Sequence, residues 1–199
     1  MTPLDVLASA TPKNHFLVWC EIEEMKPAIH ESGHAVIARL LNFDVAWVSV
    51  DRKFISNDPL AIERDLASGS AVCITLSSPR LPPILQTRGA LTKKDKATVI
   101  DYCSHVLAGP HSEMTSHVES FDPLYCMNDY EQVFGVLQSA EPNRVLRKKL
   151  LDAARRQVSR MVTKNWGLIV EVSLALDCRG TLLSRDIDAF IQSANACAT

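Results

Sequence analysis

Residues 27–42 place the strongest constraint on the fold, because their apolar side chains follow the period of a helix. Pro27 suits the first turn of a helix and is poorly tolerated later, so we expect the regular helix to begin there. The positions that define its apolar face are spaced three and four residues apart: Ile29, Gly33, Val36, Ile37, Leu40 and Leu41. The pattern predicts an amphipathic helix that packs against the core.

This helix carries His30-Glu31-Ser32-Gly33-His34, an instance of the H-E-x-x-H motif. A step of four residues places His30 and His34 on one face, where both imidazoles can reach one metal ion. Zinc suits them, because it accepts nitrogen ligands in tetrahedral geometry and can keep one position for water. Glu31 lies about 100° around the helix from His30, so its carboxylate can act as the catalytic base that deprotonates this water.

The alternative is that His30 and His34 are ordinary surface histidines that share the motif by chance. The context favours a metal site, since the motif is flanked by apolar residues and has the small residues Ser32 and Gly33 between its histidines. Glycine within a helix costs about 1 kcal/mol relative to alanine. We therefore expect another segment to approach Gly33 closely.

The remainder of the chain reads as strands and then helices. Residues 45–51 and 70–76 are rich in β-branched and aromatic side chains and predict two strands, with a polar loop or insertion between them. Thr92 and Asp95 predict a cap for a helix that ends near Gly109-Pro110. Further helices are expected over residues 128–139, 143–163, 166–178 and from 184. The predicted fold is mainly α with a small β element (α+β), in one domain over 21–199 after a lead-in over 1–20.

Composition narrows the classes of function. The formal net charge of −2 gives no general attraction to nucleic acid, and no window approaches the roughly 20 apolar residues that span a bilayer. The six cysteines form no CxxC pair and the first residues lack the basic start of a signal peptide, so we expect a cytoplasmic protein with reduced thiols. Basic residues between Arg144 and Arg160 have helical spacing, which predicts a solvated helix face.

The helix AIHESGHAVIARLL resembles the H-E-x-x-H helix of the FtsH-type zinc metalloproteases, the peptidase part of the membrane-bound AAA proteases. The similarity is weaker elsewhere and extends over about residues 24–192. It includes the strand-like VAWVSVD and SGSAVCITLSSP, and the helical VIDYCSHVLAGPHSEM, CMNDYEQVFGVL and NWGLIVEVSLALDCRGTLLSRDIDAFI.

The resemblance implies a third zinc ligand. In that family it is the aspartate of an Asn-Asp pair, and the matching residue here is Asp129. The alternative is a carboxylate that merely stabilises the start of a helix, in which case Asp122 or Glu131 would be the next candidates. Glu113 matches an acidic position of the preceding helix, for which a supporting role behind a ligand or a structural role are both open.

Other potential ligands have simpler explanations. His105, His111 and His117 are six residues apart and do not share a helix face, so we expect surface or core histidines. His15 lies outside the resemblance. Cys126 is close to Asp129 in the sequence, but buried cysteines usually serve packing.

The chain also departs from the family. It contains no G-x-x-x-x-G-K-[ST] loop, residues 52–92 look like an insertion, and Ser32 replaces the usual alanine. We therefore expect an ATP-independent zinc endopeptidase that cleaves unfolded or flexible polypeptides, with the substrate beside the strand near residues 70–76. The sequence leaves open a zinc-binding, non-proteolytic module that docks on a partner protein or separate ATPase, and a hydrolase of non-peptide amides. It also leaves the oligomeric state open.

Overall fold

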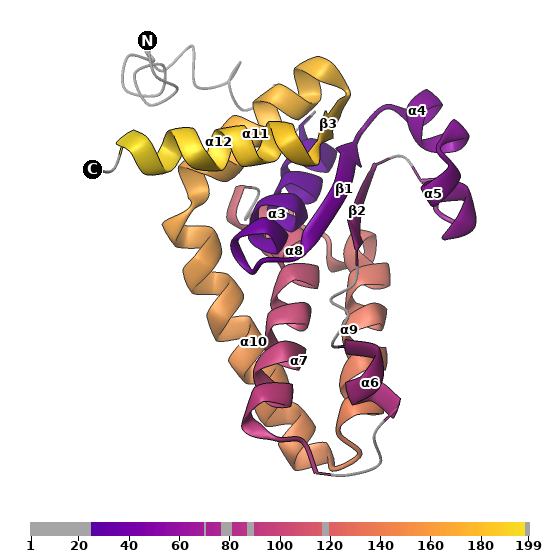
Figure 1. Ribbon diagram of the computed structural model, residues 1–199, viewed down its shortest axis with the longest axis vertical. Coiled ribbons are helices and arrows are strands. Elements are labelled where there is room, and N and C mark those ends of the chain that lie inside the picture. Colours follow the sequence, from indigo (N-terminus) through magenta and orange to yellow (C-terminus); the bar gives the residue numbers. More distant parts are fainter. Residues whose placement is uncertain (1–24, 70, 77–80, 87–89, 117–119, 198–199) are drawn as a thin grey trace.

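Helix α3 (Lys26–Leu40) lies at the centre of the computed structural model, which describes residues 25–69, 71–76, 81–86, 90–116 and 120–197 (Figure 1). Pro27 is in its first turn, as predicted. Every residue from Ala28 to Ala38 except His30 is buried, so the helix packs against the core as predicted but is enclosed on more than the one apolar face of an amphipathic helix. The helix is enclosed because α8, α11 and a small sheet all pack against it.

The sheet has three antiparallel strands in the order β2-β1-β3. The strands β1 (Asp44–Ser49) and β2 (Val72–Leu76) confirm the two predicted strands. β3 (Thr181–Leu183) was not predicted, because three residues are too few to show a period. It follows Gly180, which ends the preceding helix with a φ of 73°, in the left-handed region. β2 forms one edge of the sheet.

The polar segment after β1 is helical, which corrects the expectation of a loop. It contains two short helices, α4 (Arg52–Asn57) and α5 (Pro59–Glu63), whose first turns are capped by the carboxylates of Asp51 and Asp58. These helices lie beside the sheet (Figure 1) and enclose a small second core. That core consists of Trp47, Ile55, Ala61, Val72 and Ile74.

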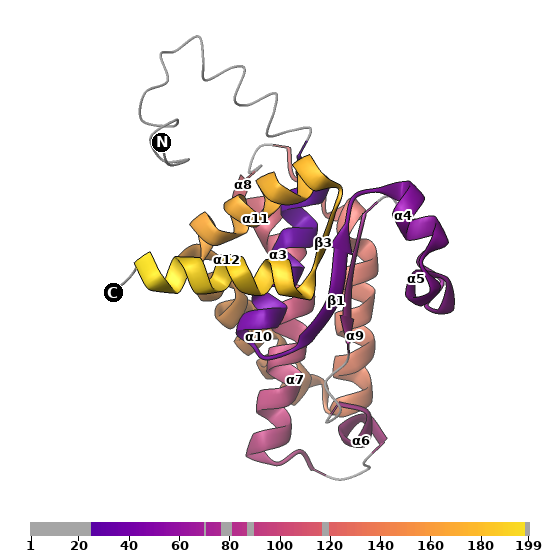
Figure 2. The ribbon, with the colours of Figure 1, turned by 45° about the horizontal axis from the view of Figure 1, so that its top comes forward.

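The next helices form an elongated bundle. They are α6 (Leu81–Gln86), α7 (Lys93–Val106), α8 (Ala108–Ser116) and, after the 3₁₀ turn η1 (Pro123–Cys126), α9 (Met127–Ala140) and α10 (Arg144–Lys164). The predicted cap is confirmed, since Thr92 and Asp95 form a capping box. The predicted helix end near Gly109-Pro110 is confirmed, since α7 ends at Val106. The chain continues directly into α8, whose first turn contains Gly109 and Pro110. Figure 2 shows α7, α9 and α10 extending away from the sheet.

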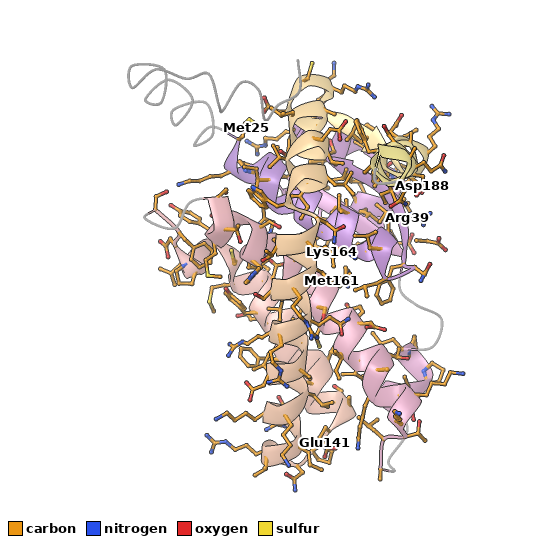
Figure 3. The ribbon with its side chains drawn as sticks, turned by 90° about the vertical axis from the view of Figure 1, so that its left-hand side faces the viewer. Met25, Arg39, Glu141, Met161, Lys164 and Asp188 are labelled. Atoms are coloured by element: carbon orange, nitrogen blue, oxygen red, sulfur yellow. The ribbon has the colours of Figure 1, made fainter. Side chains whose placement is uncertain are left out.

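Two final helices cover α3. They are α11 (Trp166–Arg179) and α12 (Ser184–Cys197). Arg39 of α3 donates two hydrogen bonds to the carboxylate of Asp188 on α12, at 2.8 and 2.9 Å (Figure 3). No helix in the described ranges combines the length and apolar character needed to cross a membrane. The architecture confirms a mainly helical fold with a small sheet; residues 1–20, His15 and His117 lie outside the described residues.

Candidate metal centre

His30 and His34 lie one turn apart on α3, and their rings face the same space. The two Nε2 atoms are 3.1 Å apart and the ring centroids 4.8 Å apart. This is the arrangement that a step of four helical residues predicts. Their side chains retain 15% and 10% exposure, so the space between them is reached from solvent.

Asp129, in the first turn of α9, completes a triangle of donor atoms. Its Oδ2 lies 3.1 Å from His30 Nε2, and its Oδ1 lies 3.4 Å from His34 Nε2. Zinc–nitrogen and zinc–oxygen bonds of about 2.0–2.1 Å in tetrahedral geometry place neighbouring donors about 3.3–3.4 Å apart. The spacings between these donors are close to those around a zinc ion, with each carboxylate oxygen of Asp129 facing a different imidazole.

Hydrogen bonds at the far side of each ring fix the tautomers. His34 Nδ1 lies 2.9 Å from the carbonyl oxygen of His105, which can only accept, so this nitrogen carries the proton. His30 Nδ1 faces the carboxylate of Glu113 at 3.1 Å and donates to it. In the neutral rings both Nε2 atoms then carry a lone pair, and these lone pairs face each other and Asp129. Three acceptors that converge in this way require a cation or protons between them.

Gly109 leaves room for that cation. A Cβ atom at this position would lie 2.3 Å from His34 Nε2 and 2.7 Å from His30 Nε2. Both distances are too short for any side chain larger than hydrogen. The backbone of α8 therefore passes close to the two ligand atoms without filling the space beside them. The donor set and this space both fit a metal ion.

Glu31 lies beside the triangle and is buried. The backbone N–H of Cys73, on β2, donates to its carboxylate. Burial raises the pKa of Glu31, although the neighbouring imidazoles and this hydrogen bond act in the opposite direction. The site thus contains a carboxylate that takes up a proton more readily than an exposed glutamate does.

Electrostatics within the cluster favour positive charge between the donors. Burial acts to lower the pKa of His30 and His34, but Asp129 and the other acidic groups outweigh it, so both pKa values lie above the usual 6.5. Burial acts to raise the pKa of Asp129, and the two imidazoles overcome it, holding that pKa below its usual value. Asp129 is accordingly ionised at neutral pH.

Two further residues stand behind His30. Glu113 accepts the hydrogen bond from its Nδ1, which is the supporting position that the sequence left open. The buried Cys126 does more than pack: its Sγ lies 3.7 Å from Glu113 Oε2 and 4.0 Å from His30 Nδ1. Donors of His30, Cys126 and Asp129 lie within 4.8 Å of one another and form a second potential metal-binding group. We favour the set with His34, because its donors already have tetrahedral spacing.

The alternative ligands do not reach the centre. Asp122 caps η1 by accepting from the N–H of Leu124, and Glu131 is exposed. His105 is a core histidine, as expected: its Nδ1 donates to the carbonyl of Tyr102, its Nε2 contacts Thr75 Oγ1, and burial lowers its pKa to about 3. His111 lines a separate hollow.

Comparison with known proteins adds no family. No family model matches the chain, and no curated protein is significantly similar to it. Functional arguments therefore rest on the residues and geometry described above.

Proposed function

We propose that this chain is a zinc-dependent, ATP-independent endopeptidase that hydrolyses unfolded or flexible polypeptides. The observation that carries the proposal is the triangle formed by His30, His34 and Asp129, three acceptors at tetrahedral spacing with Glu31 beside them. Zinc held there would acidify water and polarise the substrate carbonyl. A resemblance to FtsH-type proteases agrees with this assignment.

Glu31 supplies the proton transfer. Its carboxylate accepts a proton from the attacking water and passes it to the departing amine nitrogen. The hydrogen bond from the N–H of Cys73 restrains the carboxylate against β2. Glu113 and the carbonyl of His105 orient the two imidazoles by accepting from their Nδ1 atoms. These hydrogen bonds involve the Nδ1 atoms and therefore leave both Nε2 atoms available to a metal ion.

The surroundings support a polypeptide substrate. β2 is an edge strand, so an extended peptide can pair with it, and its Cys73 adjoins Glu31. Next to Asp129, η1 leaves Leu124 and Tyr125 71% and 84% exposed, which offers apolar contacts to a substrate side chain. Folded substrates would need unfolding by a partner, such as a separate ATPase.

A zinc-binding, non-proteolytic module is the second candidate, and Cys126 is the observation that favours it. Structural zinc sites are usually closed by four protein ligands. Donor atoms of Cys126, His30 and Asp129 lie within 4.8 Å of one another, so Cys126 is the residue that would serve as a fourth ligand after rearrangement of these side chains. The two candidates differ in whether Cys126 is needed for zinc binding.

The test compares Glu31→Gln, Asp129→Ala and Cys126→Ala with the unmodified chain. Zinc content is measured by elemental analysis and hydrolysis with fluorescently labelled casein. We expect about one zinc per chain, retention of zinc with at least about 100-fold slower hydrolysis in Glu31→Gln, and loss of zinc in Asp129→Ala. Glu131→Ala, which alters an exposed acid of the same helix, is the matched control.

Unchanged hydrolysis in Glu31→Gln would remove this residue from the chemistry. An inactive parent chain whose zinc is lost in Cys126→Ala would instead identify the closed, non-proteolytic site.

A further inference from the structure

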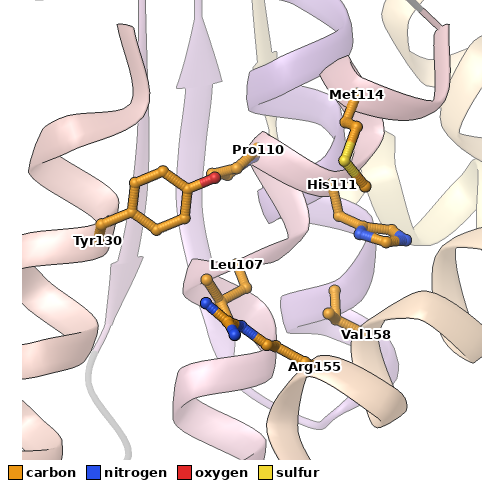
Figure 4. A pocket seen from close by; sticks show the side chains of 7 residues that line it. All are labelled: Leu107, Pro110, His111, Met114, Tyr130, Arg155 and Val158. Atoms are coloured by element: carbon orange, nitrogen blue, oxygen red, sulfur yellow. The ribbon is translucent and has the colours of Figure 1, made fainter. Parts of the chain in front are cut away.

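Two hollows lie along α9 and α10, and none of the proposed metal ligands lines either of them. The first, of about 330 Å³, is lined by Leu107, Pro110, His111, Met114, Tyr130, Arg155 and Val158 (Figure 4). The second, of about 300 Å³, is lined by Phe134, Leu137, Arg144, Arg147, Lys148 and Leu151. Both combine apolar side chains with basic ones.

Helical spacing joins the two hollows into one groove. On α9, Tyr130, Phe134 and Leu137 follow each other at steps of four and three residues and so share a face. On α10, Arg144, Lys148, Leu151 and Arg155 do the same. The helices are linked by residues 141–143, so Leu137 lies near the start of α10 and Tyr130 near Arg155. The stretch from Arg144 to Arg155 is about 17 Å long at 1.5 Å per residue.

The rim of this α9–α10 groove is positively charged. Among the described residues, no carboxylate forms an ion pair with Arg144, Arg147, Lys148 or Arg155. The acids of α9, α10 and the segment between them line neither hollow: Asp129, Glu131, Glu141 and Asp152. Arg147 donates to the backbone carbonyl oxygen of Glu141, not to its carboxylate. Phe134, which lines the second hollow, is 52% exposed. A groove of this kind offers burial to apolar groups and ion pairs to carboxylates at once.

We propose that the α9–α10 groove binds an acidic amphipathic helix of a partner protein. A helix of about three turns matches the length of the groove. Its apolar side chains, spaced like Tyr130, Phe134 and Leu137, would enter the two hollows, while its carboxylates would pair with the basic rim. The apolar lining favours such a helix over a nucleic acid, which would bring phosphates without apolar side chains. The site is independent of the metal centre and of the proposed hydrolysis.

The experiment begins with a display selection of random 16-residue peptides against the whole chain. The most enriched peptide, labelled with fluorescein, is then titrated by fluorescence anisotropy. We expect enriched sequences with acidic residues around apolar positions at helical spacing. Arg144→Glu combined with Lys148→Glu should weaken binding at least about tenfold. Phe134→Ser should weaken it to a similar extent, because it removes a half-exposed apolar side chain of the groove.

The matched control is Lys149→Glu combined with Arg156→Glu. It makes the same change in charge on exposed residues of the same helix, but outside both hollows, and should leave the affinity within about twofold. Circular dichroism verifies that each variant folds. Enrichment of basic peptides, no enrichment, or equal losses in both charge variants would overturn the proposal. The proposal would also be overturned if the groove variants left peptide binding unchanged but weakened the binding of a labelled uridine 20-mer. The same holds if they weakened only self-association of the chain, measured by sedimentation equilibrium.

Discussion

Gly109 determines how much space remains in the candidate metal centre, because it lies where α8 passes the two imidazoles. A methyl group there would come within 2.3 Å of His34 Nε2 and 2.7 Å of His30 Nε2. These are the atoms whose lone pairs are available while the Nδ1–H groups donate to Glu113 and to the His105 carbonyl. With glycine at this position the space beside the two Nε2 atoms stays open, whereas a larger residue would fill it.

Gly109→Ala should therefore reduce zinc affinity at least about 100-fold, since the imidazoles must rotate away from Asp129 to accommodate the methyl group. Titration with zinc against a competing chelator measures the change. Gly135→Ala is the control, because a Cβ on that glycine of α9 meets no atom within 4 Å. Equal affinities in both variants would show that the ion binds elsewhere.

At the scale of elements, α8 has two faces with different tasks. Gly109, Ser112 and Glu113 face α3, where they accommodate or orient its histidines, while Pro110, His111 and Met114 line the α9–α10 groove. The backbone of α8 also comes close to α3 at Gly33, where a Cβ would lie 2.7 Å from the carbonyl oxygen of Ala108 and 2.4 Å from Ser112 Oγ. The expected close approach at Gly33 is confirmed.

Gly33→Ala should lower the free energy of unfolding by about 1–3 kcal/mol, because the backbone of α8 must move away from α3. The greater helix propensity of alanine acts in the opposite direction, by about 1 kcal/mol. Urea unfolding followed by circular dichroism measures the difference. Gly135→Ala, in an open position, should keep or increase stability; a stable Gly33→Ala protein would mean that α3 and α8 are less tightly packed.

Local patterns predicted α3, the capping box at Thr92 and the paired imidazoles, since each depends on residues within one or two turns. Asp129 was indicated only by resemblance, and its position near the imidazoles comes from the packing of α9. Cys126 was indicated only by its closeness to Asp129 in the sequence. Gly109 and the carbonyl of His105 gave no local signal, because their roles depend on contacts between distant segments. The helices α4 and α5 were not predicted, because their polar composition resembles that of a loop. Asp51 and Asp58 are residue types that favour the N-cap of a helix and were the available local signal.

For the whole molecule, the metal centre is a link between elements that are distant in sequence. Its donors come from α3 and α9, and its orienting groups from α8 and the end of α7. Without a metal, the charge of Asp129 is balanced by protons on His30 and His34, whose pKa values are raised in the folded state. Stability of the metal-free protein must therefore depend on pH through these groups.

Metal-free protein should lose stability as pH rises above about 6.5, the usual pKa of histidine. Groups with raised folded pKa values stabilise the fold fully below the unfolded value and lose that contribution as pH passes the folded value. Asp129, with its lowered pKa, contributes above its usual 3.8 and loses this only in stronger acid. Urea unfolding at pH 6 and pH 8.5, with chelator or with zinc, measures both effects. Zinc replaces the protons, so its stabilisation should be larger at pH 8.5.

Asp129→Asn, which removes the carboxylate that raises both imidazole pKa values, should flatten the pH dependence of the stability of the metal-free protein. A metal-free parent chain that is more stable at pH 8.5 than at pH 6 would contradict this account of the cluster.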